Sequence, residues 1–113
     1  MTTFSFDYDD TWTRTESVKK MAQQLRQDGH TVYLVSMRNP READAAFREA
    51  LKHVDGVVFT CRAAKQPTCS SLGIKIDIWL DDCPMFILDG AIGGGLYSPV
   101  AYLGDELKSF LRF

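Results

Sequence analysis

The chain has 113 residues, of which 45% are hydrophobic and 25% are charged, and its formal net charge is −2. These values are typical of one globular domain with a core of its own, and the slightly acidic balance argues against a general nucleic-acid coat protein. The apolar runs are far shorter than the roughly 20 residues that span a bilayer, so we expect no membrane partner.

The first residues, M-T-T-F-S-F-D, lack the basic start and the long apolar stretch of a signal peptide, which predicts a cytoplasmic location. Three cysteines are present, and none has C-x-x-C spacing: Cys61, Cys69 and Cys83. A disulfide framework or a structural zinc site is therefore not expected. We expect a single domain over residues 1–113, because no linker or repeat interrupts the chain.

The first strand and helix are marked by their hydrophobic patterns. Residues 3–7 form a short apolar run that predicts a strand. Residues 16–28 then carry apolar side chains at helical spacing. Thr13 and Glu16 have the spacing of a capping box, which predicts the start of this helix, and Gly29 is expected to end it.

A second strand, a second helix and a third strand are expected next. Residues 31–36, T-V-Y-L-V-S, are almost continuously apolar, which is typical of a parallel strand covered on both faces. Asn39 and Pro40 predict a helix start, with Asn39 as the cap. Residues 57–60 read as the third strand. The buried face of the second helix is expected to consist of Ala43, Ala46, Phe47, Ala50 and Leu51.

The second half of the chain continues the alternation. A short helix is expected over 67–72 and a fourth strand over 76–80, where Trp79 would lie in the core. Residues 92–102 suit either a loop or an edge strand, and 104–113 a final helix with apolar residues facing inward. Alternating strands and helices predict an α/β fold: a three-layer sandwich with a central, mostly parallel sheet and a Rossmann-like core.

Polar side chains gather where the predicted strands end. In an open parallel sheet this carboxyl edge is where ligands bind. Carboxylates crowded there repel one another unless a cation lies among them, and Mg²⁺ is the usual partner of carboxylates and phosphate. A serine and a lysine could hold phosphate oxygens, as in phosphoryl transfer. The candidate site residues are Asp7, Asp9, Ser36, Lys65, Asp81 and Asp82.

The stretch D-Y-D-D-T at residues 7–11 resembles the D-x-D-x-T signature of the haloacid dehalogenase superfamily. Three further segments resemble the later motifs of that superfamily in the same order: V-S at 35–36, Lys65, and I-W-L-D-D-C-P at 78–84. The resemblance covers roughly residues 3–87.

This resemblance implies a role for each acid. Asp7 would be the nucleophile that forms an aspartyl-phosphate, and Asp9 the general acid and base. Mg²⁺ would be held by the carboxylate of Asp7, the backbone carbonyl of Asp9 and Asp82, with Asp81 as an alternative or supporting ligand. Thr11 would brace the loop through its hydroxyl and is also a possible substrate contact.

Other candidates carry open alternatives. Trp12 is a possible substrate contact, with core packing as the alternative, and Arg38 a possible phosphate or substrate contact, with a surface position as the alternative. Lys75 competes with Lys65 for the role of phosphate-binding lysine. Residues 93–95, three glycines, suit an anion nest or a flexible loop.

The segments after Thr11 and after the third strand are too short for a cap domain, so the resemblance implies a capless member with an open site. The predicted function is that of a Mg²⁺-dependent phosphatase acting on a phosphorylated small molecule, protein or nucleic-acid end. Homo-oligomerisation could add a wall to the site. The alternative is a catalytically weak or inactive metal-binding module with a regulatory role.

Overall fold

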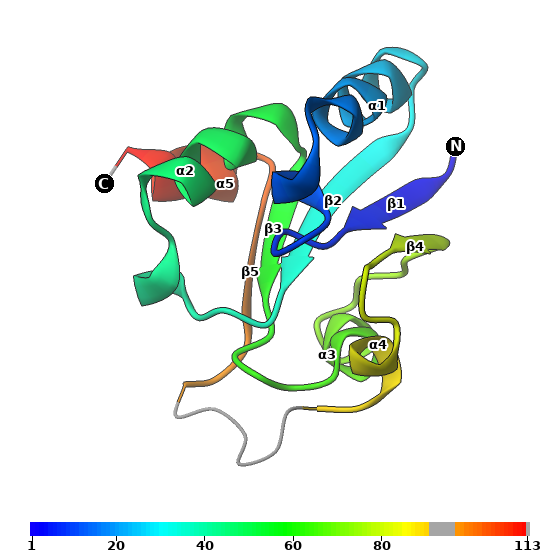
Figure 1. Ribbon diagram of the computed structural model, residues 1–113. Coiled ribbons are helices and arrows are strands. Elements are labelled where there is room, and N and C mark those ends of the chain that lie inside the picture. Colours follow the sequence, from blue (N-terminus) through cyan, green and yellow to red (C-terminus); the bar gives the residue numbers. More distant parts are fainter. Residues whose placement is uncertain (91–96, 113) are drawn as a thin grey trace.

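A five-stranded mixed sheet forms the centre of the molecule, which a computed structural model describes over residues 1–90 and 97–112 (Figure 1). The strand order is β4-β1-β2-β3-β5. The first four of these are parallel to one another, and β5 runs antiparallel to β3. The strands are β1 (Thr3–Phe6), β2 (Thr31–Ser36), β3 (Gly56–Phe59), β4 (Ile78–Leu80) and β5 (Val100–Leu103).

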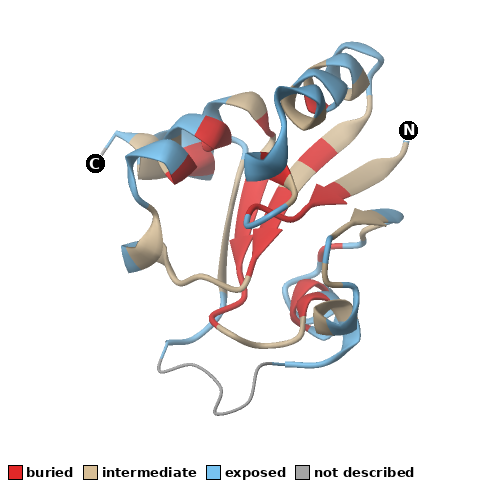
Figure 2. Ribbon diagram, in the orientation of Figure 1, coloured by how far each residue is buried: buried red, intermediate tan, exposed pale blue. Residues whose placement is uncertain are grey.

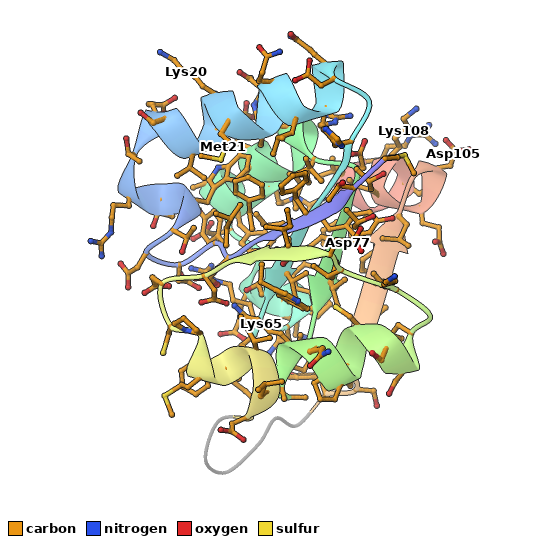
Figure 3. The ribbon with its side chains drawn as sticks, turned by 90° about the vertical axis from the view of Figure 1, so that its right-hand side faces the viewer. Lys20, Met21, Lys65, Asp77, Asp105 and Lys108 are labelled. Carbon is orange, nitrogen blue, oxygen red and sulfur yellow. The ribbon has the colours of Figure 1, made fainter. Side chains whose placement is uncertain are left out.

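Helices lie on both faces of this sheet, with α1, α2 and α5 on one face and α3 and α4 on the other (Figures 1 and 3). Within residues 1–90 and 97–112, three 3-10 turns supplement them, at Trp12–Arg14, Pro40–Glu42 and Leu51–His53. None of the helices in the described part of the chain has the length and hydrophobicity that a membrane span requires. The α-helices are α1 (Glu16–Gln27), α2 (Ala45–Ala50), α3 (Lys65–Ser71), α4 (Met85–Leu88) and α5 (Asp105–Leu111).

The core follows from the alternation of side chains along the central strands. Leu34 of β2 packs with Phe47 of α2 on one face, while Val35, one residue later, packs with Cys69 of α3 on the other. The central strands β2 and β3 are therefore apolar on both faces, and Figure 2 shows them as the most buried part of the sheet. The predicted α/β fold with a mostly parallel sheet is confirmed at this level.

The start of α1 differs from the prediction. The capping box of Thr13 and Glu16 does not form: Thr15 is the N-cap, and its hydroxyl accepts from the backbone N of Ser17 at 3.3 Å. Thr13 instead accepts from the backbone N of Asp10 at 3.0 Å, because the preceding residues form a 3-10 turn of their own.

The second helix is also shorter than predicted. Asn39 does form a capping box with Glu42, but this box closes only the 3-10 turn. The chain then restarts at Asp44, whose carboxylate accepts from the backbone N of Phe47 at 2.9 Å and caps α2. As a result Ala46, predicted to be buried, is exposed.

The last third of the chain resolves one open alternative. Residues 100–103 form the edge strand β5, paired with β3, so the edge-strand interpretation is confirmed there. The strand predicted over 76–80 is paired only from Ile78 onward, and Trp79 is half-buried against the α3 side of the sheet. The glycines at 93–95 lie outside the described residues.

Candidate active site

The predicted carboxyl edge of the sheet brings three segments together. Asp7 directly follows β1, Asp81 directly follows β4, and Lys65 is the first residue of α3. The backbone N of Asp7 donates to the carbonyl of Leu80 at 2.9 Å, which continues the β1–β4 pairing up to the acids. Figure 3 shows Lys65 between α3 and the sheet.

Lys65 is a buried cation between two carboxylates. Only 2% of the residue is exposed. Its Nζ donates to Asp7 Oδ1 at 2.8 Å and to Asp81 Oδ2. A buried ammonium group is strongly unfavourable without such partners, so the two acids and the lysine depend on one another. The competing candidate Lys75 has a side chain that is 91% exposed, and it pairs with Asp77.

Thr11 joins the two acidic segments. Its hydroxyl lies 3.4 Å from Asp7 Oδ2 and 3.4 Å from Asp82 Oδ1, and it accepts from the backbone N of Asp82 at 3.1 Å. Asp81 uses its second oxygen, Oδ1, to accept from the backbone N of Cys83 at 2.9 Å. Asp81 is thus held on both oxygens, whereas Asp82 is exposed to solvent.

Three carboxylates converge at this point. Asp7, Asp81 and Asp82 each present an oxygen, and these oxygens all lie within 4.8 Å of one another. Burial raises the pKa of Asp7 to about 7, with a hydrogen bond to Asp82 adding to the rise and Lys65 opposing it. The same hydrogen bond lowers the pKa of Asp82. Oxygen-only donors that converge in this way suit a hard divalent cation, so the group could hold a metal ion.

Asp9 and Arg38 form a second group. Asp9 accepts from Arg38 with both oxygens, from Nη2 at 2.7 Å and from Nε at 3.1 Å. Among the residues described, the converging carboxylates do not include Asp9. Ser36 is 1% exposed, and its hydroxyl accepts from the backbone N of Arg38 at 3.1 Å. The phosphate-binding role of Ser36 stays a prediction.

The predicted substrate contacts fall into different places. Trp12 is 8% exposed and packs edge-on against Phe6, with 6.0 Å between the rings. This position favours the core alternative. Arg38 lies at the carboxyl edge, and its half-buried side chain is not that of a plain surface residue. Its contact with a phosphate or substrate stays a prediction.

Two features of the site were not found from the sequence. One is the pairing of Asp9 with Arg38, and the other is Tyr8, whose ring lies 5.0 Å below the Arg38 guanidinium. The available signal was an aromatic residue between two acids, together with an arginine two positions past the end of a strand. The loop also places Asp10 in the left-handed region at φ 63°.

Comparisons of the chain with protein-family models, with curated proteins and with solved structures find no match in any of the three.

Proposed function

We propose that this protein is a Mg²⁺-dependent phosphatase that hydrolyses phosphomonoesters through an aspartyl-phosphate on Asp7. The observation that carries the proposal is the buried Lys65 between Asp7 and Asp81, with Asp82 next to them at the carboxyl edge of a parallel sheet. The motif order that resembles the haloacid dehalogenase superfamily supports it. On this proposal the chain is a single capless domain, with a three-layer sandwich and a Rossmann-like core.

The chain's own residues would act in two steps. A carboxylate oxygen of Asp7 attacks phosphorus, the bond to the leaving alcohol breaks, and Asp9 supplies the proton that this alcohol takes up. Asp9 then accepts a proton from water, whose oxygen attacks the aspartyl-phosphate and releases inorganic phosphate and free Asp7. Lys65 would stay bound to the site as a fixed positive charge that stabilises the phosphoryl oxygens.

The proposed Mg²⁺ would be held by Asp7, by the backbone carbonyl of Asp9 and by Asp82. Bound there, it would neutralise carboxylate charge and polarise a phosphoryl oxygen. Asp82 is the better ligand of the neighbouring pair, because both oxygens of Asp81 already accept hydrogen bonds from Lys65 and from Cys83. Asp81 would then act by positioning Lys65.

Hydrolysis of p-nitrophenyl phosphate tests this function. We expect turnover with Mg²⁺, none with EDTA, and none in Asp7→Asn, which keeps the shape of the side chain. Asp10→Asn is the matched control, since it removes one negative charge three residues away at an exposed position. Turnover that persists in EDTA or in Asp7→Asn would contradict the proposal.

One observation favours a second candidate, a metal-binding module without turnover. Asp9, the proposed acid and base, is held by Arg38 rather than turned toward Asp7. Calorimetry would then show Mg²⁺ binding, while phosphorylated small molecules, phosphopeptides and phosphorylated oligonucleotides would all remain unhydrolysed. The leading proposal, the phosphatase, also includes a phosphorylated substrate as the partner and a cytoplasmic location for the enzyme.

A further inference from the structure

The guanidinium of Arg38 is held in place by groups other than Asp9. Its Nη1 donates to the carbonyl of Glu42 at 2.8 Å. Its Cζ lies 5.0 Å from the centre of the Tyr8 ring and 5.4 Å from that of Phe47, two buried aromatic residues. Asp44 adds an ion pair at 3.8 Å. The planar group is thus fixed on one edge and against both rings, whatever its remaining edge binds.

That remaining edge consists of Nε and Nη2, and Asp9 occupies it. The two contacts, at 3.1 and 2.7 Å, are the paired geometry in which a guanidinium binds a carboxylate or a phosphate. The side chain of Asp9 is 55% exposed, while that of Arg38 is 22% exposed. The acid is therefore the partner that can leave, and the arginine is the partner that stays.

Both oxygens of Asp9 bind Arg38, so neither is free to give a proton to the leaving alcohol of a substrate bound at Asp7. Asp9 must leave Arg38 before it can donate or accept a proton in the proposed reaction. Once it leaves, Arg38 would be a half-buried cation with an open pair of donors, an unfavourable state unless another anion takes the place of Asp9.

We propose that Arg38 recognises a second anionic group on the leaving-group side of the substrate, and that Asp9 occupies this anion site in the free protein. The inference rests on the proposed phosphatase function and narrows its substrate class to phosphomonoesters that carry a further phosphate or carboxylate. Binding of that group to Nε and Nη2 exchanges one anion for another. The exchange releases Asp9 beside the leaving oxygen and keeps Arg38 paired throughout.

A matched set of substrates tests this inference. The substrates are phosphate monoesters of straight-chain alcohols of graded length that end in a methyl group, a carboxylate or a second phosphate. We expect kcat/KM to favour an anionic end by about 10- to 100-fold at the best length, the range for hydrogen bonds to a charged group. The carboxylate and phosphate arms tell the two forms of the anion apart.

The variants separate Arg38 from the general charge of the site. Arg38→Gln should remove the preference, and Arg38→Lys should restore only part of it, since lysine lacks the paired donors. Arg41→Gln is the matched control: it removes one positive charge three residues away, where the side chain stacks on Tyr97 at 5.5 Å. A preference that survives in both folded Arg38 variants, or that is lost equally in Arg41→Gln, would overturn the inference.

A binding measurement distinguishes this inference from the proposed function. In the Asp7→Asn background, calorimetry should show tighter binding of the esters with an anionic end. Asp9→Asn should tighten it further, and more than the equally charged change Asp10→Asn does, because only Asp9 competes for Arg38. Hydrolysis without any preference among the ends would overturn the inference and leave the phosphatase function standing. If the esters with an anionic end bound more tightly but no ester was hydrolysed, the anion site at Arg38 would stand and the phosphatase function would fail.

Discussion

Replacing Asp7 by asparagine should make the metal-free protein more stable at neutral and alkaline pH. Asp7 is 8% exposed, and the charged groups that face its carboxylate are Lys65 from α3 and the acids Asp81 and Asp82 after β4. Burial and the neighbouring acids oppose its charge more than Lys65 supports it, which is why its pKa is raised to about 7. Asparagine keeps the shape and carries no charge.

The direction of the pH dependence follows from this raised pKa. Between pH 3.8, the ordinary value, and about 7, the unfolded chain has lost the proton of Asp7 while the folded protein keeps it. The free energy of unfolding therefore falls as pH rises, by about 1.4 kcal/mol per pH unit. Over roughly three units the loss reaches about 4 kcal/mol, and it is complete above pH 7.

Asp7→Asn does not titrate and should escape this loss. At pH 8 in EDTA we expect it to unfold at a higher temperature than the wild type, by about 16 °C if one kcal/mol corresponds to about 4 °C in a domain of this size. At pH 4 the two proteins should differ little. Mg²⁺ should raise the melting temperature of the wild type more than that of Asp7→Asn, which keeps Asp82 and the Asp9 carbonyl as ligands but lacks the Asp7 carboxylate.

Thermal unfolding followed by circular dichroism at a series of pH values measures all of these quantities. Asp10→Asn serves as the control for the loss of one negative charge at an exposed position. If Asp7→Asn melted below the wild type at pH 8, or if both proteins lost stability equally from pH 4 to pH 8, the assigned balance of burial and ion pairing would be wrong.

Three further predictions concern the structure of the site. Lys65→Met should lower the free energy of unfolding by about 3–5 kcal/mol, because it leaves buried acids without their cation. The control Lys75→Met should change it by less than about 0.5 kcal/mol. If urea unfolding gave similar effects for the two variants, the placement of Lys65 would be contradicted. Asp82→Asn should abolish the Mg²⁺-induced rise in melting temperature at little cost to the metal-free fold, whereas Asp81→Asn should destabilise the metal-free fold through Lys65. The opposite pattern would make Asp81 the main ligand. Asp10→Gly should raise stability by about 0.5–1 kcal/mol, because φ is 63° there, and a lower melting temperature would argue against that backbone conformation.

The sheet and the meeting of the acids could be predicted because both depend on local patterns. Continuous apolar runs such as 31–36 identify strands that are buried on both faces, and helices between them require the strands to be parallel. Parallel strands end at the same edge, so Asp7 and Asp81 are expected on one edge of the sheet. The two acids meet because β1 and β4 are neighbouring strands, which only the strand order of the structure shows. The sequence predicts Lys65 just before a helix over 67–72, and in the structure this helix, α3, begins at Lys65 itself.

The remaining features depend on contacts between segments that the sequence does not rank. Asn39 and Asp44 are both good helix caps, and only the packing of Phe47 into the core decides that the helix proper starts at the second one. Likewise, the sequence does not indicate which basic residue pairs with Asp9. It pairs with Arg38 because Tyr8 and Phe47 hold that guanidinium beside it, a geometry set by tertiary packing.

The charges of the site also set an order of binding. With Asp9 and Arg38 neutralising each other, three acids and Lys65 leave two formal negative charges at the carboxyl edge. A phosphate dianion would be repelled by this edge, and a divalent cation would cancel its charge. We therefore expect inorganic phosphate to bind only after Mg²⁺, with an affinity that falls at least about tenfold in EDTA when measured by calorimetry at pH 8. Equal affinity in the two conditions would mean that phosphate is held by the basic side chains alone, and Lys65 rather than the acids would then be the centre of the site.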